Sequence, residues 1–393
     1  MSINAPARAP NKATTRPNVI SHCARSPYYS CTWSDAAIYG EYAGRLVLLS
    51  LGKDANEEYW RLRKSVGLFD VPERPVEIKG PDSVGFLNRV FTRPVDTLRT
   101  GRGSYGLLCH QRGGMVCDGI LFKLAENHYW YVHADAEVYA WLVALAIDFK
   151  VDIRDPRSWV LQVQGPHSME VLARACDDGG PEDFRYFDAI QSRMGGQDVL
   201  ISRTGWSGEL GFEVYNLDPD VDGPALWNHL LSAGADFGIA GCGQLSMNIR
   251  RIEAGILNYS TDMDWHTTPY DMGLGKFVEL ENHDFIGRDA LIRCDKRPRF
   301  AGFKCHEGRP KFGSAVLSKG QPAGRITAFE NSPYLGSGVG FILLDTPEFI
   351  DKGGLEFIDR EGRERPLELI SLPFYDREKR IPRGLPPMDG LLD

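Results

Sequence analysis

The sequence predicts an α+β protein in which two related α+β domains are followed by a small β-barrel. A strand at residues 76–79 and another at residues 160–164 each run into the sequence Gly-Pro-x-Ser and then into a helix. Proline suits the first turn of a helix, and a neighbouring Asp or Ser can cap its free N–H groups. Two copies of one unit indicate two related domains with a ligand cleft between them. From residue 299 onward, short strands separated by Gly and Pro are typical of a small barrel.

Length and charge restrict the possible partners. At 393 residues, 42% of them hydrophobic, the chain is long enough for two or three domains with cores of their own. Its net charge of −8 argues against a nucleic-acid partner, because a polyanion is bound by a basic surface. No apolar run approaches the roughly 20 residues of a membrane span, so no membrane partner is expected. The polar N-terminal segment with Arg8, Lys12 and Arg16 predicts a disordered leader, with a transit peptide as the alternative.

Cysteine and histidine usage bears on metals and on the compartment. The eight cysteines are scattered without C-x-x-C spacing, and the nine histidines are equally dispersed. This pattern favours reduced thiols in a cytoplasmic protein, and we expect no bound metal.

The N-terminal half begins with an aromatic segment containing Tyr28, Tyr29 and Trp33, which either packs onto a core or forms part of a substrate pocket. Residues 54–66 predict a helix that ends at Gly67, and the first repeated helix ends at residue 90. A hairpin at residues 105–123 then contains Asp118, which alternation places on the inward face of its strand. A buried carboxylate is costly unless paired, so Asp118 should have either a structural partner or a catalytic role.

After a strand at 129–133 and a helix at 136–146, the second repeated unit leads to a glycine-rich turn at residues 203–211. The strand at 212–215 follows at once, and its alternation places Glu213 and Tyr215 on one face. The glycines would let the backbone approach a flat ligand, and the acid could hold a heterocycle with adjacent N–H groups. An ordinary hairpin edge is the other interpretation.

Further along, a helix is predicted at 223–233 and another within 241–255, where Arg251 and Glu253 could be surface charges. The polar and aromatic stretch 257–274 predicts a long loop, and such loops are often functional. A short capped helix is expected at 285–291. In the barrel region, strands are expected at 324–327, 332–335, 338–342 and 367–370.

Several separated motifs together resemble the tetrahydrofolate-dependent glycine-cleavage T-protein (aminomethyltransferase) family and its demethylase relatives, over residues 54–343. Any one of these motifs is weak, and their joint order carries the resemblance. They are Leu68-Phe-Asp70, Gly113-Gly-Met-Val-Cys-Asp118, Arg203-Thr-Gly-Trp-Ser-Gly-Glu with Gly211-Phe-Glu213, Arg251-Ile-Glu-Ala-Gly255, Asp262 with His266-Thr-Thr-Pro269, and the turn at 327–335.

The resemblance implies a three-domain cloverleaf of two ferredoxin-like α+β domains and a C-terminal β-barrel, with a folate cleft at its centre. It implies a first, folate-binding domain of residues 1–67 and 155–245. The second domain would comprise residues 68–154 and 246–297, and the barrel residues 298–393.

The resemblance also implies tetrahydrofolate as the cofactor. Glu213 would hold the pterin ring through a bidentate, charge-assisted pair of hydrogen bonds, and Asp118 would act catalytically near N5 of the folate. The other cofactor-binding candidates are Tyr215, Trp206, Arg251 and Tyr259. The candidates for contact with the one-carbon donor, where the aromatic side chains could surround an onium group, are Tyr28, Tyr29, Trp33, Asp262 and His266.

Departures from the family pattern favour one branch of it. Cys117 replaces the first residue of the family's Asp-Asp pair, Trp206 replaces a tyrosine, and residues 73–82 resemble dimethylsulfoniopropionate demethylase. We therefore expect a methyltransferase or demethylase that moves a methyl group from a small sulfonium, N-methyl or O-methyl donor to N5 of tetrahydrofolate. The alternatives are an aminomethyltransferase with a lipoyl carrier protein as partner, and a non-catalytic folate-binding regulatory protein. A monomer or a homodimer is expected.

Overall fold

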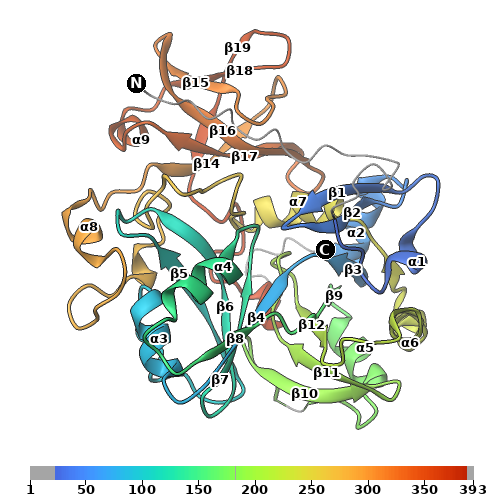
Figure 1. Cartoon of the computed structure of the whole chain (residues 1–393). Coiled ribbons are helices and arrows are strands. Elements are labelled where there is room, and N and C mark those ends of the chain that lie inside the picture. Colours follow the sequence, from blue (N-terminus) through green and yellow to red (C-terminus); the bar gives the residue numbers. More distant parts are fainter. Residues whose placement is uncertain (1–22, 182, 387–393) are drawn as a thin grey trace.

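The computed structural model describes residues 23–181 and 183–386 (Figure 1). The predicted leader around Arg8, Lys12 and Arg16 lies outside these residues. Within them, no helix combines the length and the apolar character needed to cross a membrane.

The first α+β unit is a six-stranded sheet with helices on one face. Phe212 and Val214 point toward α5 and α6 and share a core with Leu172 and Trp227 of those helices, whereas Tyr215 belongs to the core on the opposite face. The alternation predicted for residues 212–215 is therefore confirmed. In sheet order, the strands are β10 (Ala189–Met194), β11 (Gln197–Ser202), β12 (Gly211–Asn216), β9 (Val160–Gln164), β3 (Gly67–Val71) and β13 (Ala240–Gly241), and the helices are α5 (Ser168–Ala175), α6 (Gly223–Ala233) and the 3-10 turn η2 (Ala235–Phe237).

The second α+β unit repeats this arrangement with a five-stranded sheet. Phe86 of α3 and Leu142 of α4 pack with Val76 and Ile78 on its outer face. In both units a strand, a Gly-Pro turn and a helix follow one another, so the predicted repeat is confirmed. In sheet order, the strands are β5 (Arg102–Cys109), β6 (Met115–Ala125), β7 (His128–His133), β4 (Arg74–Lys79) and β8 (Asp152–Arg154), with helices α3 (Ser83–Val90) and α4 (Val138–Leu145).

The inner faces of the two sheets meet each other. Phe122 and Trp130 from the five-stranded sheet share a buried core with Tyr215 and Leu200 from the six-stranded sheet, and Figure 1 shows the two sheets beside one another. Side chains on these inner faces therefore lie between the two units, where a ligand cleft was expected.

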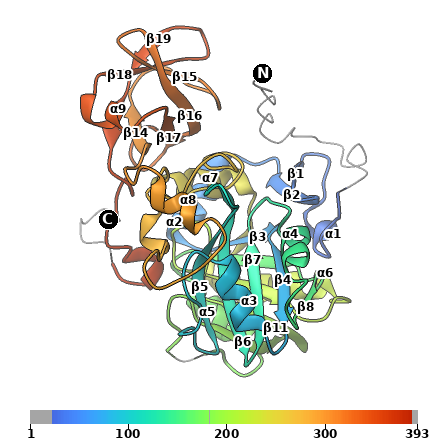
Figure 2. The same ribbon diagram turned by 60° about the vertical axis from the view of Figure 1, so that its left-hand side comes forward.

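The C-terminal unit is a nearly closed barrel (Figure 2), and Val339 and Phe341 of this unit share a buried core with Leu107 and Met115 of the five-stranded sheet. Its edge strands β19 and β20 are separated by Leu367 alone, whose N–H donates to the carbonyl of Leu355 on β18. The expected strand at 332–335 is wrong: this segment is a turn, in which the Leu335 N–H donates to Ser332 Oγ at 2.9 Å. The elements are β14 (Phe300–Cys305), β15 (Ala315–Ser318), β16 (Gln321–Ser332), β17 (Ser337–Leu344), α9 (Glu348–Lys352), β18 (Leu355–Ile358), β19 (Glu364–Pro366) and β20 (Glu368–Ile370).

The remaining elements connect these units. Asp54 caps α2 by accepting from the Asn56 N–H at 3.0 Å, and the helix ends before Gly67, which begins β3 rather than stopping the helix. The elements are α1 (Tyr29–Thr32), β1 (Ile38–Tyr42), β2 (Arg45–Ser50), α2 (Ala55–Lys64), α7 (Gln244–Glu253), η3 (Gly275–Phe277), α8 (Arg288–Arg293) and η4 (Ile381–Arg383).

The domain ranges stay a prediction, and the pairing of β3 moves one of their limits. Because β3 pairs along its length with β9, residues 68–71 belong with the six-stranded sheet, and the first domain would extend past residue 67.

Candidate functional site

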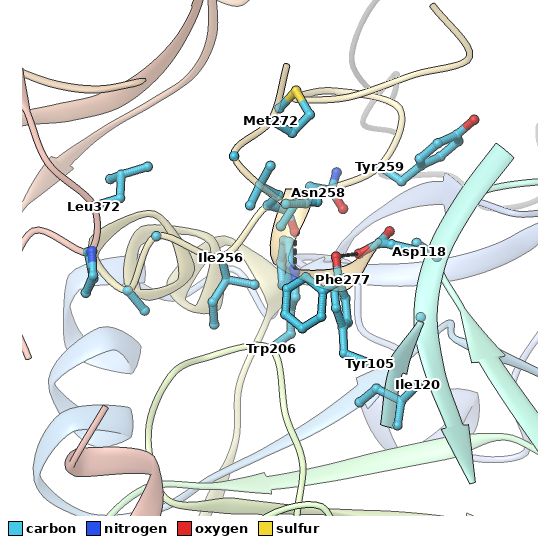
Figure 3. A pocket seen from close by; sticks show the side chains of 18 of the residues that line it. Tyr105, Asp118, Ile120, Trp206, Ile256, Asn258, Tyr259, Met272, Phe277 and Leu372 are labelled. Carbon is cyan, nitrogen blue, oxygen red and sulfur yellow. Dashed lines mark hydrogen bonds between the residues drawn. The ribbon is translucent and has the colours of Figure 1, made fainter. Parts of the chain in front are cut away.

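A cavity of about 1030 Å³ lies where the two sheets, the loop 257–274 and the C-terminal segment after the barrel come together. Small-molecule sites in proteins commonly measure about 300–1,000 Å³, so this cavity suits a ligand at the upper end of that range. Asp118, Trp206, Glu213 and Tyr259, predicted as site residues from widely separated motifs, all line it. Figure 3 shows three of them, Asp118, Trp206 and Tyr259, with their neighbours.

One carboxyl oxygen of Asp118 has a hydrogen-bond partner among the described residues, and the other has none there. It lies on β6, and the Tyr105 hydroxyl of β5 donates to its Oδ2 at 2.7 Å (Figure 3). Its Oδ1 is buried and accepts no hydrogen bond from the part of the chain that the structure describes. Desolvation raises the pKa of Asp118 to about 6, although the Tyr105 hydrogen bond opposes the rise. Asp118 can therefore exchange a proton near neutral pH.

Glu213 is held by donors from its own sheet. Its Oε2 accepts from the hydroxyls of Tyr215 at 2.6 Å, Thr204 at 2.5 Å and Ser202 at 3.4 Å, and its Oε1 accepts from Gln162 at 2.8 Å. Burial raises the pKa of Glu213, and these hydrogen bonds lower it.

These four internal donors leave Glu213 too few free acceptor positions for the expected bidentate pair of hydrogen bonds to a ligand. Each carboxylate oxygen offers about two acceptor positions. Three donors crowd Oε2 and one occupies Oε1, so Glu213 keeps one position, on Oε1, for a ligand. Two ligand N–H groups would have to displace one of the internal donors. Tyr215, expected to touch the cofactor, is fully buried beneath this carboxylate and does not line the cavity.

The glycines of the turn before β12 serve packing as well as approach. A Cβ at Gly205 or at Gly211 would lie 2.3 Å from the side chain of Gln164. Gln164 in turn accepts a hydrogen bond from Ser207 at 2.6 Å. The glycine pattern therefore makes room for a buried amide that fixes the turn, and Gly205 also reaches the cavity wall.

Trp206 and Tyr259 are wall residues fixed through their polar ends. The indole N–H of Trp206 donates to the Leu257 carbonyl at 3.2 Å, and the Tyr259 hydroxyl donates to the Met115 carbonyl at 3.0 Å. Each bond ties the loop 257–274 to one of the two sheets.

Arg251 and Asp262 form a buried ion pair behind this wall at 2.5 Å. Asp262 also accepts from the Thr327 hydroxyl of the barrel at 2.9 Å, and the Arg251 guanidinium lies 5.1 Å from the Trp206 ring. The interpretation of Arg251 and Glu253 as surface charges is wrong, because both are buried. Neither Arg251 nor Asp262 lines the cavity, so both act by holding the loop and Trp206 in place.

The aromatic segment near the N-terminus does not reach the cavity. Tyr28 is buried in the core of the first unit, and Tyr29 stacks on the exposed Trp33 at 5.8 Å between ring centroids. The expected aromatic wall from these three residues is therefore wrong, because α1 packs on the outer side of the six-stranded sheet. His266, also expected at the donor, is exposed on the loop and lies outside the cavity lining.

Glu73 and Tyr42 are among the cavity residues that were missed as candidates from the sequence. Glu73, between β3 and β4, and Tyr42, at the end of β1, both line the cavity. Burial, followed by the negative charge of Glu213, raises the pKa of Glu73 to about 8. The only sequence signal was the similarity of residues 73–82 to a demethylase, which gave Glu73 no role.

Cationic side chains also line the cavity. Arg93 and Lys276 lie 5.3 and 5.1 Å from the centre of the Phe277 ring. Arg377 and Lys379 of the C-terminal segment also line the cavity. No side chain in residues 23–181 and 183–386 forms an ion pair with any of the four.

The described part of the chain contains no cluster of metal-binding side chains and no disulfide. No group of three or more His, Cys, Asp or Glu side chains there is placed to hold a metal ion, and the cysteines are free thiols. Burial, followed by Asp118, raises the pKa of Cys117 well above its usual value, so this thiol stays neutral beside the aspartate.

Comparisons with known proteins agree with this architecture. Residues 28–282 match the GCVT N-terminal domain, and residues 299–376 match the glycine cleavage T-protein C-terminal barrel domain. The aminomethyltransferase of Corynebacterium aurimucosum is 32% identical over 339 residues, covering 82% of this chain and 90% of that protein. The aminomethyltransferase of Streptomyces coelicolor is 32% identical over 353 residues, covering 86% and 94%.

A solved structure extends the similarity to the fold. Glycine cleavage system aminomethyltransferase T from Bartonella henselae superimposes with a TM-score of 0.81 at 26% identity, covering 90% of this chain and 98% of that one. The chain belongs to the glycine cleavage T-protein family and is an enzyme of its one-carbon transferase type.

Proposed function

We propose that the chain transfers a one-carbon unit to tetrahydrofolate bound in the central cavity, and that this unit is an aminomethyl group. The observation that carries the proposal is that one cavity is lined both by three acids, Glu73, Asp118 and Glu213, and by the cations Arg93 and Lys276. Tetrahydrofolate has a matching polarity, because its pterin ring presents N–H donors and its glutamyl end is anionic. The names of the similar aminomethyltransferases support the choice of group.

The residues of the cavity fit this cofactor. The remaining acceptor position of Glu213 would accept a hydrogen bond from a ring N–H, and Trp206 and Phe277 offer aromatic walls. The cations of the cavity would attract the carboxylates of the cofactor's glutamyl end. Bound tetrahydrofolate supplies the nitrogen that accepts the one-carbon unit. Asp118 would hold or release a proton at Oδ1, and Tyr105 keeps that carboxyl oriented through Oδ2. Orienting two reactants in a closed site can contribute about 7–11 kcal/mol to lowering a barrier.

Methyl transfer from a small donor is the second candidate. Cys117 favours it, because a neutral thiol beside Asp118 leaves the site with one acid where the family pattern has two. A sulfonium or ammonium donor departs as a neutral leaving group and needs little acid–base help. An aminomethyl donor carried by a lipoyl protein loses ammonia, so proton transfer matters more there.

Product analysis separates the two candidates. The protein is incubated with tetrahydrofolate and either an aminomethylated lipoyl carrier protein or a panel of onium, N-methyl and aryl methyl ether compounds. Release of ammonia with the carrier protein supports the proposal. Formation of 5-methyltetrahydrofolate from a small donor, without ammonia, replaces aminomethyl transfer by methyl transfer. Binding of tetrahydrofolate without turnover of either class of donor would overturn both candidates.

Two substitutions test the assignment of residues. Glu213→Ala should abolish tetrahydrofolate binding in calorimetry, and unchanged affinity would remove the folate site from this cavity. Asp118→Asn should retain binding and lose turnover, since the amide cannot exchange the proton; full turnover would refute its role. Glu77→Gln, on β4 outside the cavity and paired with His128, is a control for loss of an acid elsewhere.

A further inference from the structure

Glu73 lines the cavity, and one oxygen of its carboxyl group is buried without a hydrogen-bond partner in the described part of the chain. Its backbone carbonyl accepts from Arg45 Nη1 at 2.9 Å, which fixes the chain between β3 and β4. Its side chain lines the cavity, yet Oε2 is buried and has no hydrogen-bond partner among the residues that the structure describes. A buried polar atom without a partner costs about 1–3 kcal/mol, and a charged one costs more, so the missing partner favours the protonated carboxyl group.

The negative charge of Glu213 raises the pKa of Glu73, and of these two acids only Glu213 has side-chain donors, within the described residues, that favour its ionised form. Glu213 accepts four hydrogen bonds, from three hydroxyls and an amide, which favour its anion. The free oxygen of Glu73 accepts none. Two close carboxylates seldom ionise together, so the proton of the pair belongs on Glu73.

The surrounding groups agree with this assignment. Arg45 of β2 favours the anion of Glu73, whereas Asp70 of β3 opposes it, and both effects are smaller than those of burial and of Glu213. Tyr42 of β1 and Tyr215 of β12 also face Glu73, and its charge raises the pKa of both phenols. The cations Arg93 and Lys276 of the cavity wall are not among the groups with the largest effects on the pKa of Glu73.

We propose that Glu73 is held as a neutral carboxylic acid and donates a hydrogen bond to the carbonyl oxygen of a lactam edge on the ligand. A lactam edge presents an N–H beside a C=O, as the pyrimidinone ring of a pterin does. Glu213 accepts the N–H at its one remaining position, and Glu73 supplies the donor that Glu213 cannot. This inference rests on the proposed folate site and gives it a second recognition residue.

Glu73 and Glu213 together explain how Glu213 can recognise the ring with only one acceptor position left. A carboxylate with a single free acceptor position can bind one N–H, which many heterocycles offer. A carboxylate and a carboxylic acid together bind a ring N–H and a ring carbonyl. A ring that lacks the carbonyl leaves the Glu73 carboxylic acid without a hydrogen-bond acceptor. Ionised Glu73 would instead repel the carbonyl oxygen.

Calorimetry with tetrahydrofolate between pH 6.5 and 9 tests the inference, using the wild type, Glu73→Gln, Glu73→Ala and Glu77→Gln. The wild type should bind more weakly above pH 8 as Glu73 ionises. Glu73→Gln keeps a donor that does not titrate, so it should match the wild type at pH 6.5 and retain its affinity at pH 9. Glu73→Ala should bind about three- to tenfold more weakly at pH 6.5, as expected for one lost hydrogen bond.

The outcomes separate this inference from the proposed function. Binding by the wild type with an identical pH profile in Glu73→Gln overturns the role of Glu73 and leaves the folate site intact. An absence of wild-type binding removes both. Glu77→Gln should keep the wild-type profile, since it lies outside the cavity. If Glu73→Ala does not fold, the profile of Glu73→Gln decides alone.

Discussion

Replacing Glu253 by alanine should loosen the attachment of the barrel and the C-terminal segment to the rest of the molecule. Glu253 is fully buried at the end of α7. Its carboxylate accepts from the Tyr59 hydroxyl of α2 at 2.9 Å to each oxygen. It also accepts from Ser332 at the end of β16 at 2.5 Å and from Tyr375 of the C-terminal segment at 2.7 Å.

The size of the effect follows from the groups left behind. Glu253→Ala leaves three buried hydroxyls without an acceptor, each costing about 1–3 kcal/mol, and water entering the space recovers part of that. The Arg250 guanidinium, 4.0 Å away, loses a neighbouring negative charge, and breaking a buried charged contact costs about 3–5 kcal/mol. Because these costs overlap, we expect a destabilisation of about 3–6 kcal/mol. Glu253→Gln keeps the shape and one acceptor, and should cost about 1–2 kcal/mol.

Urea unfolding followed by tryptophan fluorescence measures this, with the exposed Glu281→Ala as a control expected within about 0.5 kcal/mol of the wild type. In a protein of several domains the transition need not be two-state, so the midpoint of the first transition is compared. A midpoint for Glu253→Ala as high as that of Glu281→Ala would refute the assignment of this carboxylate as the junction of three segments.

Three further outcomes follow. Burial raises the pKa of Asp70 to about 7 and of Glu73 to about 8, above their unfolded values near 4, so their contribution to stability is full below about pH 4 and is lost as the pH rises through 7 and 8. Glu73→Gln should therefore melt at a higher temperature than the wild type at pH 8.5, by calorimetry, with the difference shrinking toward pH 5; a constant difference would contradict this. Tyr105→Phe removes the hydrogen bond that lowers the pKa of Asp118, so the limb of the pH–rate profile due to Asp118 should move upward by about half a unit to one unit, and an unmoved limb would exclude the coupling. Lys276→Ala should weaken tetrahydrofolate binding about three- to tenfold at low ionic strength and less at high salt, whereas an effect independent of salt would rule out charge attraction.

Local patterns predicted the elements of this fold well wherever the signal lay within one segment. The helix α6 follows Asp222, which accepts from the Ala225 N–H at 3.0 Å, and Pro224 occupies its first turn. Both are visible in the sequence, and the predicted bounds of this helix match. The alternation along β12 likewise assigned Glu213 and Tyr215 to one face. The alternation could not show that the Tyr215 hydroxyl donates its hydrogen bond to Glu213 and not to a ligand.

The errors arose where a side chain meets something distant in sequence. Arg251 and Glu253 have the spacing of charges on a solvated helix, and they are buried because barrel and C-terminal residues cover α7. The aromatic segment with Trp33 was expected at the pocket, because nothing local shows on which side of a sheet a helix packs. Glu73 stands between two strands without a motif of its own, and the charge that acts on it most strongly comes from Glu213 on β12, far along the sequence.

The cavity illustrates one solution to placing several acids together. Asp118 and Glu213 are stabilised by hydroxyl and amide donors and not by ion pairs, and Glu73 retains a proton. Had the cations on the wall neutralised these acids, neither set would be open to a ligand, since a close ion pair satisfies both partners. Arg93 and Lys276 lie against the Phe277 ring, so both the cations and the acids of the cavity remain available to a ligand. A ligand that carries N–H and C=O groups as well as anionic groups can therefore be bound by both sets of side chains.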